Sequence, residues 1–576
     1  MKPSARLSRI PGRYLLAFGA GLLQAASFPN LGLFWQAWLA PGLILLLALD
    51  RPRAFRLGYC AGLGHYGLSL YWLLLMPLPV KAVLAWLAVS AILSLYTGAW
   101  TWFCCRTFPL ATIAGAPASW PRRSFWALTC ASAWVAMEMG IARIATGFPW
   151  NLLGVSQYKM LPLIQIASVT GVYGVSFLIV WLSTSLAVAA FGVRPPKAFG
   201  AGAFPGVESS KWAEPAPKSK APEDWRTPKR FSAVLCDLAL PPAGLLAVLG
   251  FGLNRLAQPE PAGRTLKVAL VQPSIPQTVI WDPKEATNRF HKLVALSHQA
   301  LATQPDLLVW PEAALPDLLT RFNPLTHDAV TNLVLPNHLW MILGADDARP
   351  KKNAVNPDDV AFFNAGFLVA PNGELVATYF KRHLVMFGEY LPFARWLPFL
   401  KKFRATEGGF TPGDSPVPFV LSEPNATISV LICFEDVFPH LVRGSVEPDT
   451  DFLLNLTNNG WFGESAAQWQ HAVSALFRAV ENGLPLVRCT NNGLTCWIDA
   501  RGRLHDQYFP GSWNIYGAGF KLGRVPLHEK SQAHPLTFYH RHGDWFGWGC
   551  VVLTGAALLQ GLLHRPRRSL AVNPSG

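Results

Sequence analysis

Three residues of the types that carry out covalent acyl chemistry each follow a short apolar run. Glu312 follows DLLVWP, Lys381 follows ATYF and Cys433 follows TISVLI. A thiol attacks a carbonyl carbon once a base takes its proton, and an ammonium stabilises the oxyanion that forms. The set therefore predicts Cys433 as nucleophile, Glu312 as general base and Lys381 as a cation that lowers the thiol pKa. Taken singly, each also fits a purely structural role: Glu312 as a helix-start carboxylate, Lys381 as a surface lysine and Cys433 as a buried core thiol.

The apolar runs that precede these residues indicate β-strands of an α/β domain. Several are rich in Leu or β-branched residues without alternation, which is typical of strands buried on both faces. Helical patterns at 285–303 and 466–482 separate them, and Asn492-Gly493 predicts a tight hairpin turn. Ligand chemistry in α/β folds gathers where strands end, so the three polar residues are expected to meet there. The predicted strands are 266–273, 306–312, 339–345, 361–373, 427–436, 452–463 and 484–502.

The composition indicates a membrane protein. Hydrophobic residues make up 51% of the 576 residues, charged residues only 14%, and 23 residues are Trp, whereas about a quarter of the residues in soluble proteins are charged. A bilayer-spanning helix needs about 20 mostly apolar residues. We predict eight spans, at 13–28, 31–49, 55–76, 79–104, 124–142, 161–192, 232–253 and 545–563.

The net charge of +15 is concentrated between these apolar segments, at 1–13, 50–56, 104–124, 193–231 and 564–576. With the N-terminus in the cytoplasm, all five stretches fall on the cytoplasmic side, as the positive-inside rule requires. The charge therefore reports topology and argues against nucleic acid as a partner. By parity, the block between the last two spans lies outside the cytoplasm.

We therefore predict three parts of the chain. Residues 1–257 form a membrane domain of about seven spans, with a flexible cytoplasmic loop at 194–230 whose composition cannot bury enough apolar surface to fold. Residues 258–535 form an external catalytic domain, and residues 536–576 form a last transmembrane helix with a cytoplasmic tail.

Four motifs in this order, VWPEAALP, KRHLVMFGEYLPF, LICFED and LTNNGWFG, resemble the nitrilase superfamily with its Glu-Lys-Cys triad. The membrane segments, together with GFPWNLLGVSQ and VALVQPSIPQ, narrow the resemblance to the apolipoprotein N-acyltransferase family. That resemblance covers nearly the whole chain. It implies an αββα sandwich as the external domain, a location in the bacterial inner membrane and a catalytic side facing the periplasm.

The resemblance also implies the reaction. Cys433 takes an acyl chain from a phospholipid as a thioester, and the free amine of a diacylglyceryl-cysteine at an apolipoprotein N-terminus then takes the chain as an amide. No metal or other cofactor is needed. By resemblance, Glu389 orients Lys381 or the incoming amine, and Glu435, two residues after the nucleophile, is a candidate for shaping the site. The segment 389–403 alternates aromatic, Leu and Pro residues with cations, a composition that suits an interfacial lid or an ordinary covering loop.

Further residues are implied as substrate-binding or gating positions, namely Trp281, Trp461, Asn458 and Gly154, the last allowing a lipid chain or the external domain to approach closely. Three positions depart from the family pattern. Phe434 stands where Tyr is usual, which puts a role of that hydroxyl in doubt, Met386 replaces Pro, and Asn459 replaces a common Asp.

Alternatives remain open on the sequence. A membrane-tethered nitrilase-like amidase would use the same triad in a water-filled pocket, and a non-catalytic scaffold or transporter would need ionisable residues in its spans. Glu138 and Arg143, near the outer end of one span, are expected to pair with each other. Cys489 and Cys496 flank the Asn492-Gly493 turn, so a disulfide between them in an oxidising compartment is one option.

Overall fold

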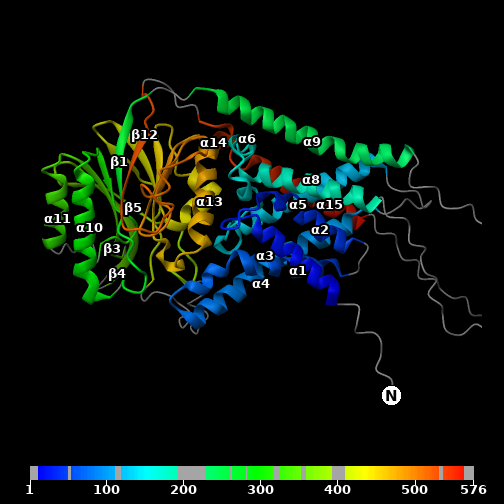
Figure 1. Ribbon diagram of the computed structural model, residues 1–576, viewed down its shortest axis with the longest axis horizontal. Helices are drawn as coiled ribbons and strands as arrows, with labels where there is room; N and C mark the ends of the chain where they lie inside the picture. The colour runs from blue at the N-terminus through cyan, green and yellow to red at the C-terminus, as the bar shows by residue number, and fades with distance from the viewer. Residues whose placement is uncertain are drawn as a thin grey trace, which may run out of the picture.

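A computed structural model of the chain describes residues 11–49, 53–109, 119–192, 228–259, 263–280, 282–315, 324–351, 359–391, 409–530 and 536–563. Within these ranges, two β-sheets and their helices form an α/β unit at one end of the molecule, and long helices form the other end (Figure 1). The predicted α/β class of the segment after residue 258 is confirmed.

Two six-stranded sheets, each with a parallel centre and antiparallel edges, make up the α/β unit. In the first sheet β1 pairs in parallel with β2 and β2 with β3, and in the second β7 pairs in parallel with β8 and β8 with β9. The first sheet runs β12 (Gly519–Pro526), β1 (Thr265–Gln272), β2 (Leu307–Val309), β3 (Trp340–Pro350), β4 (Val360–Val369) and β5 (Leu375–Phe380). The second runs β11 (Leu504–His505), β10 (Cys496–Ile498), β9 (Leu486–Thr490), β8 (Phe452–Thr457), β7 (Ala426–Ile432) and β6 (Pro418–Leu421).

The sheets pack face to face around an apolar layer, with helices on their outer faces. Successive side chains of β3 face different layers. Ile342 lies in the core between the sheets, and Met341 lies in the core beneath the outer helices. The outer helices of the first sheet are α10 (Ala286–Leu301) and α11 (Pro324–Val334), and α13 (Ala466–Asn482) covers the second (Figure 1). The unit is therefore an αββα sandwich. Its shorter helices are η5 (Pro283–Glu285), η8 (Cys433–Val437), α12 (Pro439–Arg443), η9 (Asn459–Phe462) and α14 (Phe538–His542).

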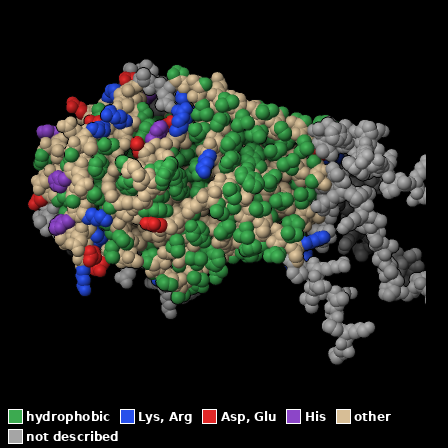
Figure 2. Space-filling view, viewed as in Figure 1, with side chains coloured by type: hydrophobic (Ala, Val, Ile, Leu, Met, Phe, Trp, Pro, Cys, Tyr) green, Lys and Arg blue, Asp and Glu red, His purple; other side chains and the backbone are tan. Residues whose placement is uncertain are grey.

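The other half of the molecule is a bundle of apolar helices. Hydrophobic side chains cover its surface, whereas charged side chains gather on the α/β end (Figure 2). The bundle consists of α1 (Pro11–Ala26), η1 (Phe34–Trp38), α2 (Ala40–Ala48), α3 (Ala54–Ser69), η2 (Tyr71–Leu75), α4 (Pro79–Thr107), α5 (Trp120–Ile141), η3 (Ile144–Thr146), η4 (Leu153–Gln157), α6 (Leu161–Ile164), α7 (Ala167–Thr170), α8 (Val172–Gly192), α9 (Pro228–Ala257) and α15 (Trp545–Leu563).

Each of the eight predicted spans contains helix, but only three helical stretches in the described residues are long and apolar enough to cross a membrane by themselves. These are Pro79–Thr107, Val172–Ala190 and Asp237–Ala257. The first and last expose large side chains such as Leu87 at 52% and Leu246 at 68%, as a lipid-facing surface does, whereas Val172–Ala190 is mostly buried. The count of eight spans stays a prediction.

The helix ends that lie away from the α/β unit meet one another. Arg106 at the end of α4 donates a hydrogen bond to the carbonyl of Gly561 on α15. Arg123 on α5 pairs with Asp237 on α9, with Nε 2.9 Å from Oδ2. The ends of four helices therefore share one side, and Asp237 there is paired with Arg123.

Helix α13 joins the two halves of the molecule. Ser465 caps its start by accepting a hydrogen bond from the Ala467 amide, and Gly483 ends it at φ +74°. Apart from Trp469, all residues of the helix are buried, because one face covers the second sheet and the rest packs with α7, α14 and the bundle core. Glu481 accepts a hydrogen bond of 2.8 Å from the Val172 amide at the start of α8. The α/β unit is thus anchored in the helical half.

The open option of a disulfide next to the predicted hairpin turn is not realised. The hairpin forms, with β9 and β10 antiparallel around Gly493 at φ +118°. Both cysteines are free. Cys489 lies in the core between the sheets and Cys496 in the core beneath α13, so the two thiols face opposite sides of one sheet.

Candidate active site

Cys433 occupies a sharp turn between β7 and η8. The strand ends at Ile432, and Cys433 has φ +53°, in the left-handed region that residues other than Gly, Asn and Asp seldom adopt. Such conformations persist only where surrounding contacts fix them, and they are concentrated at functional sites. The side chain of Cys433 is partly exposed and packs against the end of the core between the sheets.

Lys381 and Glu312 come from strand ends of the first sheet. Lys381 directly follows β5 and Glu312 lies three residues after β2, and the Lys381 Nζ is 3.4 Å from Glu312 Oε1 and 2.7 Å from Glu389 Oε1. The second oxygen of Glu312 accepts a 2.8 Å hydrogen bond from the Asn458 amide. Lys381 is only 1% exposed. Burial by itself lowers the pKa of Lys381, but Glu389, Glu312 and Cys433 outweigh burial and hold that pKa well above its ordinary value.

Three effects act on the pKa of the Cys433 thiol. Burial raises the pKa of the thiol to about 12, Glu312 adds to the rise, and Lys381 opposes it. Lys381 was expected to lower the thiol pKa, and its own effect has that sign, but the other two effects are larger. A raised thiol pKa favours the protonated form, so attack by the sulfur requires a base to take the proton.

Asn364 is part of the site, although the sequence reasoning missed it. Its Nδ2 donates to Glu312 Oε1 at 2.7 Å and to Glu389 Oε1 at 3.2 Å, so one amide and one ammonium hold the two carboxylates together. Glu389 Oε2 accepts a further 2.8 Å hydrogen bond from the Val385 amide. The signal was present in AFFNAGFLV, where Asn364 is the one polar residue of an apolar strand.

Glu435 links the Cys433 turn to the segment that carries Lys381. Its carboxylate accepts hydrogen bonds from the Ile432 amide at 2.7 Å, the Arg382 amide at 2.7 Å, the His383 amide at 3.0 Å and the Tyr379 hydroxyl at 2.8 Å. Glu435 is completely buried. It therefore links the two sheets at the site, and burial raises the pKa of Glu435 although its hydrogen bonds oppose that rise.

A further carboxyl, Asp346, lies near the same group. Asp346 stands directly opposite Asn364 in the β3–β4 ladder, so both side chains lie on the same face of the sheet. Burial, Glu312 and Glu389 raise the pKa of Asp346 to about 7, and Lys381 opposes that rise. Because this pKa lies above the usual value for Asp, the native state binds a proton more tightly than the unfolded chain, and stability falls as pH rises from the ordinary Asp pKa to about 7, then levels off.

We therefore expect the melting temperature of Asp346→Asn, relative to that of the natural protein, to be higher at pH 8 than at pH 5, because the variant has no carboxyl to ionise at this position. Melting temperatures in detergent at the two pH values measure the effect. Asp328→Asn is the matched control, since the Asp328 side chain is 70% exposed. A difference between Asp346→Asn and the natural protein that is the same at both pH values would show that Asp346 ionises normally.

Phe434 lies in an aromatic cluster that the α/β unit shares with the helical half. Its ring centroid is 6.0 Å from that of Trp150, 5.8 Å from that of Phe148 and 5.0 Å from that of Phe438. This apolar cluster thus begins directly beside Cys433 and continues onto η2 and α3 through Trp72 and other members of the same cluster.

Asn458 serves the site through its backbone. Its side-chain Nδ2 donates to Gln277 Oε1 at 3.0 Å, and its Oδ1 accepts from the Gly460 amide and from Asn491 Nδ2, each at 3.0 Å. Its side chain is thus engaged within the protein, and its amide holds Glu312. Trp461 follows on η9 and is partly exposed. Trp281 and most of the expected lid, residues 392–403, lie outside the described residues.

Gly154 makes a close contact different from the expected one. A Cβ at this position would lie 2.7 Å from the Val172 carbonyl oxygen and 3.1 Å from the Ser176 amide nitrogen, both on α8. The Gly154 amide also donates to the Ser176 hydroxyl at 2.8 Å. Glycine is needed here because α8 approaches the chain, and neither the external domain nor a lipid chain fills this contact.

The expected pair of Glu138 and Arg143 is wrong. Arg143 pairs with Asp544 at the start of α15, whereas Glu138 Oε1 accepts hydrogen bonds from Trp134 Nε1 at 2.9 Å and from the Leu153 amide at 2.8 Å. The sequence placed the two charges near one another, but Arg143 meets a distant carboxylate and Glu138 bonds to groups within 15 residues of itself.

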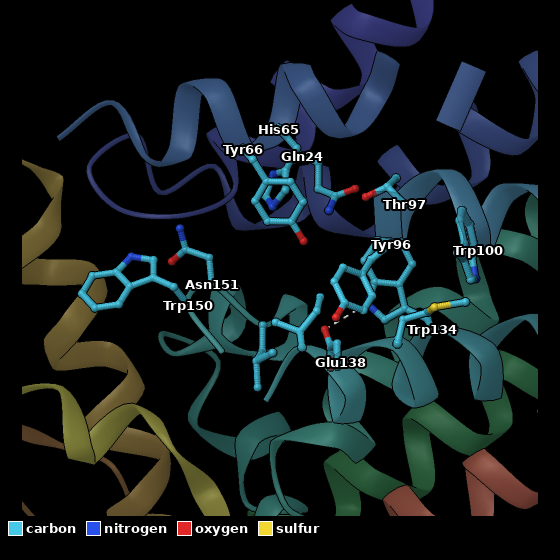
Figure 3. A pocket seen from close by; sticks show the side chains of 13 residues that line it. Gln24, His65, Tyr66, Tyr96, Thr97, Trp100, Trp134, Glu138, Trp150 and Asn151 are labelled. Atoms are coloured by element: carbon cyan, nitrogen blue, oxygen red, sulfur yellow. Dashed lines mark hydrogen bonds between the residues drawn. The ribbon is translucent and has the colours of Figure 1, made fainter. Parts of the chain in front are cut away.

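Glu138 also lines a small cavity inside the helical half (Figure 3). The cavity of about 20 Å³ has room for about one water molecule, which needs roughly 10–15 Å³. Figure 3 shows Glu138 across the cavity from Gln24 and Tyr66, with Trp150 at its edge. It is too small for an acyl chain. In the part of the chain that the structure describes, no group of three His, Cys, Asp or Glu residues is placed to hold a metal ion.

The two six-stranded sheets, with Glu312, Lys381 and Cys433 at adjoining strand ends, define a nitrilase-type domain, and residues 267–512 match the family model described as carbon-nitrogen hydrolase. Residues 20–185 match the model of the apolipoprotein N-acyltransferase N-terminal domain. The apolipoprotein N-acyltransferase of Geobacter metallireducens is 35% identical over 565 residues, covering 97% of each chain. The chain belongs to the apolipoprotein N-acyltransferase family.

Two further proteins are similar to this chain. The apolipoprotein N-acyltransferase of Allorhizobium ampelinum is 29% identical and covers 91% of this chain and 93% of its own. A solved structure of an amidase from Nesterenkonia sp. aligns with 46% of this chain and 91% of its own, at 18% identity and a TM-score of 0.33.

Proposed function

We propose that this protein transfers a fatty acyl chain from a phospholipid to the N-terminal amine of diacylglyceryl-cysteine apolipoproteins. Membership of the family supports lipoprotein N-acylation. The observation that carries the proposal for this chain is the position of Cys433, which shares a buried site with Lys381 and Glu312 and adjoins the apolar cluster of the helical half. A water-filled amidase pocket would not need that cluster.

In the first half-reaction, the Cys433 sulfur attacks the ester carbonyl of the donor while Glu312 takes the thiol proton. A bond forms between sulfur and carbon, and the oxyanion that develops is stabilised by the Lys381 ammonium and by a backbone N–H near Phe434. When the ester C–O bond breaks, Glu312 returns the proton to the leaving oxygen. The products are a lysophospholipid and an S-acyl enzyme.

In the second half-reaction, the acceptor amine attacks the thioester. A carbon–nitrogen bond forms, the carbon–sulfur bond breaks, and Glu312 passes the proton lost by the amine to the Cys433 sulfur. Glu389 and Asn364 hold Glu312 and Lys381 in place through both half-reactions. The scheme is ping-pong, because the lysophospholipid leaves before the acceptor reacts. The thioester is already activated, so the transfer needs no other energy source.

We further propose the topology. The chain is a multi-pass protein of the bacterial inner membrane with eight spans, and its catalytic unit, within residues 258–535, faces the periplasm. Three apolar helices of sufficient length and the shared side of the α4, α5, α9 and α15 ends support this arrangement. Donor and acceptor both carry lipid chains, so they reach Cys433 from the membrane, past Trp461 and the aromatic cluster around Phe434.

The decisive assay uses the full chain in vesicles whose phospholipid carries isotope-labelled acyl chains, together with a diacylglyceryl-cysteine peptide. We expect the label in an amide on the peptide N-terminus, measured by mass spectrometry. The same peptide with an acetylated N-terminus is the matched control and should receive no label. Labelled free fatty acid without acylated peptide, or hydrolysis of small amides, would support the amidase instead, and no turnover at all would support a scaffold.

A further inference from the structure

The backbone carbonyl of Cys433 is held by two buried side chains. Asn455 Nδ2 donates to this oxygen at 2.9 Å, and His471 Nε2 lies 3.2 Å from it. Asn455 comes from β8 and His471 from α13, so the two contacts reach the Cys433 turn from different elements. Because Cys433 adopts φ +53°, its conformation depends on contacts of this kind and not on its own preference.

His471 is itself held tightly. Its Nε2 lies 2.7 Å from Asp436 Oδ1, the other Asp436 oxygen pairs with Arg488, and its Nδ1 lies 3.0 Å from Asn459 Oδ1. His471 is 1% exposed, and Asp436 and Arg488 are completely buried. The imidazole therefore cannot turn without leaving buried polar groups unpaired.

These contacts assign the role of the imidazole. Asp436 Oδ1 and the Cys433 carbonyl are both acceptors, so Nε2 must carry a hydrogen and act as the donor. A Cys–His–Asp triad needs a ring nitrogen free to accept the thiol proton. Here the nitrogen closest to Cys433 is a donor, and it faces the carbonyl oxygen. His471 is thus not the base, despite its place beside a cysteine and an aspartate.

The helical half also contacts this imidazole. The His471 and Trp150 ring centroids lie 5.5 Å apart, and Trp150 Nε1 donates at 2.8 Å to Oε1 of Gln470, the neighbour of His471 on α13. Trp150 also packs against Phe434, the neighbour of Cys433. One residue of the bundle therefore contacts both the imidazole and the turn that carries the nucleophile.

We infer that His471 is a positioning residue, which holds the Cys433 carbonyl so that the turn keeps the thiol beside Glu312 and Lys381, and which Trp150 supports from the helical half. The inference rests on the proposed function, because it assigns the support of that nucleophile. A hydrogen bond from His471 restricts the rotation of the peptide unit after Cys433, and the direction of the Sγ follows from that peptide. Loss of the His471 hydrogen-bond donor is expected to slow the attack by the Cys433 sulfur and to leave the binding of the phospholipid unchanged.

The test compares His471→Leu, which has no donor, with His471→Gln, which retains an N–H donor. In His471→Leu, single-turnover formation of the Cys433 thioester in phospholipid vesicles is expected to slow on the order of 10–100-fold, because small misplacements of reacting groups have effects of that size. The phospholipid concentration that gives the half-maximal rate should stay unchanged. His471→Gln should recover part of the rate. Ser474→Ala is the matched control, since Ser474 is buried on the same helix and donates only to the Gln470 carbonyl.

Equal rates for His471→Leu and the natural protein would overturn the inference, as would a slower rate that His471→Gln does not improve. If His471→Leu fails to fold, Asn455→Leu replaces it, because it removes the other donor to the same carbonyl, and an unchanged rate there would equally contradict the positioning role. If the natural protein forms no thioester, the proposed function fails. The pH profile of Cys433 alkylation by iodoacetamide then decides the inference, and profiles identical in His471→Leu and the natural protein would reject it.

Discussion

Replacement of Cys433 by alanine is expected to abolish the acyl adduct and all acyl transfer. The natural protein, purified from membranes, should carry a fatty acyl group that hydroxylamine removes, because a thioester on the nucleophile accumulates until an acceptor arrives. Intact-mass spectrometry detects the adduct directly. Alanine leaves no atom to form the covalent bond, and neither Glu312 nor Lys381 can replace it.

The matched control for this prediction is Cys489→Ala. Cys489 lies on β9 of the second sheet, buried in the core between the sheets, and its thiol contacts the carbonyls of Val271 and Val309 at 3.5 and 3.4 Å. That variant should retain the hydroxylamine-labile mass. An adduct that survives in Cys433→Ala, or one lost in both variants, would refute Cys433 as the nucleophile.

The second large effect is expected for Glu312→Gln, which should separate two properties of Cys433. Acyl transfer should fall by roughly 10²–10⁴-fold, the usual contribution of a positioned general base. The reactivity of the thiol toward iodoacetamide should increase at a given pH. Glu312 raises the pKa of Cys433, so its neutral replacement lowers that pKa and increases the thiolate fraction.

Glutamine suits this test because it retains the shape of Glu312 and an oxygen that can accept from the Asn458 amide. Alkylation rates between pH 7 and pH 10 and transfer rates in vesicles are measured on the same preparations. Glu374→Gln, at an exposed turn position, is the matched control and should change neither rate. A parallel fall of both rates in Glu312→Gln would show that Glu312 maintains the structure of the site and does not act as its base.

Local sequence patterns were sufficient for the scaffold of the site. The limits of α13 agree with the predicted 466–482, because Ser465 and Gly483 are strong helix-ending signals and the apolar spacing is regular. The strands before Glu312 and Cys433 form where the apolar runs predict them, since burial on both faces leaves a clear mark on composition. The strand before Lys381 also forms at its apolar run, although it is only partly buried. The hairpin at Gly493 follows from its turn residues in the same way.

Pairings between distant segments were beyond the sequence. Arg143 lies five positions from Glu138 yet pairs with Asp544, some 400 residues further along the chain. Nothing local indicates that the start of α15 approaches the end of α5. In the same way, the resemblance implied that Gly154 lets a lipid chain or the external domain approach closely, whereas helix packing brings α8 against it.

The sequence by itself determined which residue types are available for acyl chemistry, the order of the strands that carry them, and the apolar character of the other half, because each of these depends on neighbours within a few positions. Only the tertiary structure decided how those groups behave. Burial and the approach of Glu312 raise the pKa of Cys433 despite Lys381, and Asn364 joins two carboxylates that lie 77 residues apart along the chain. Desolvation and contacts between distant strands are properties of packing, so no local pattern records them.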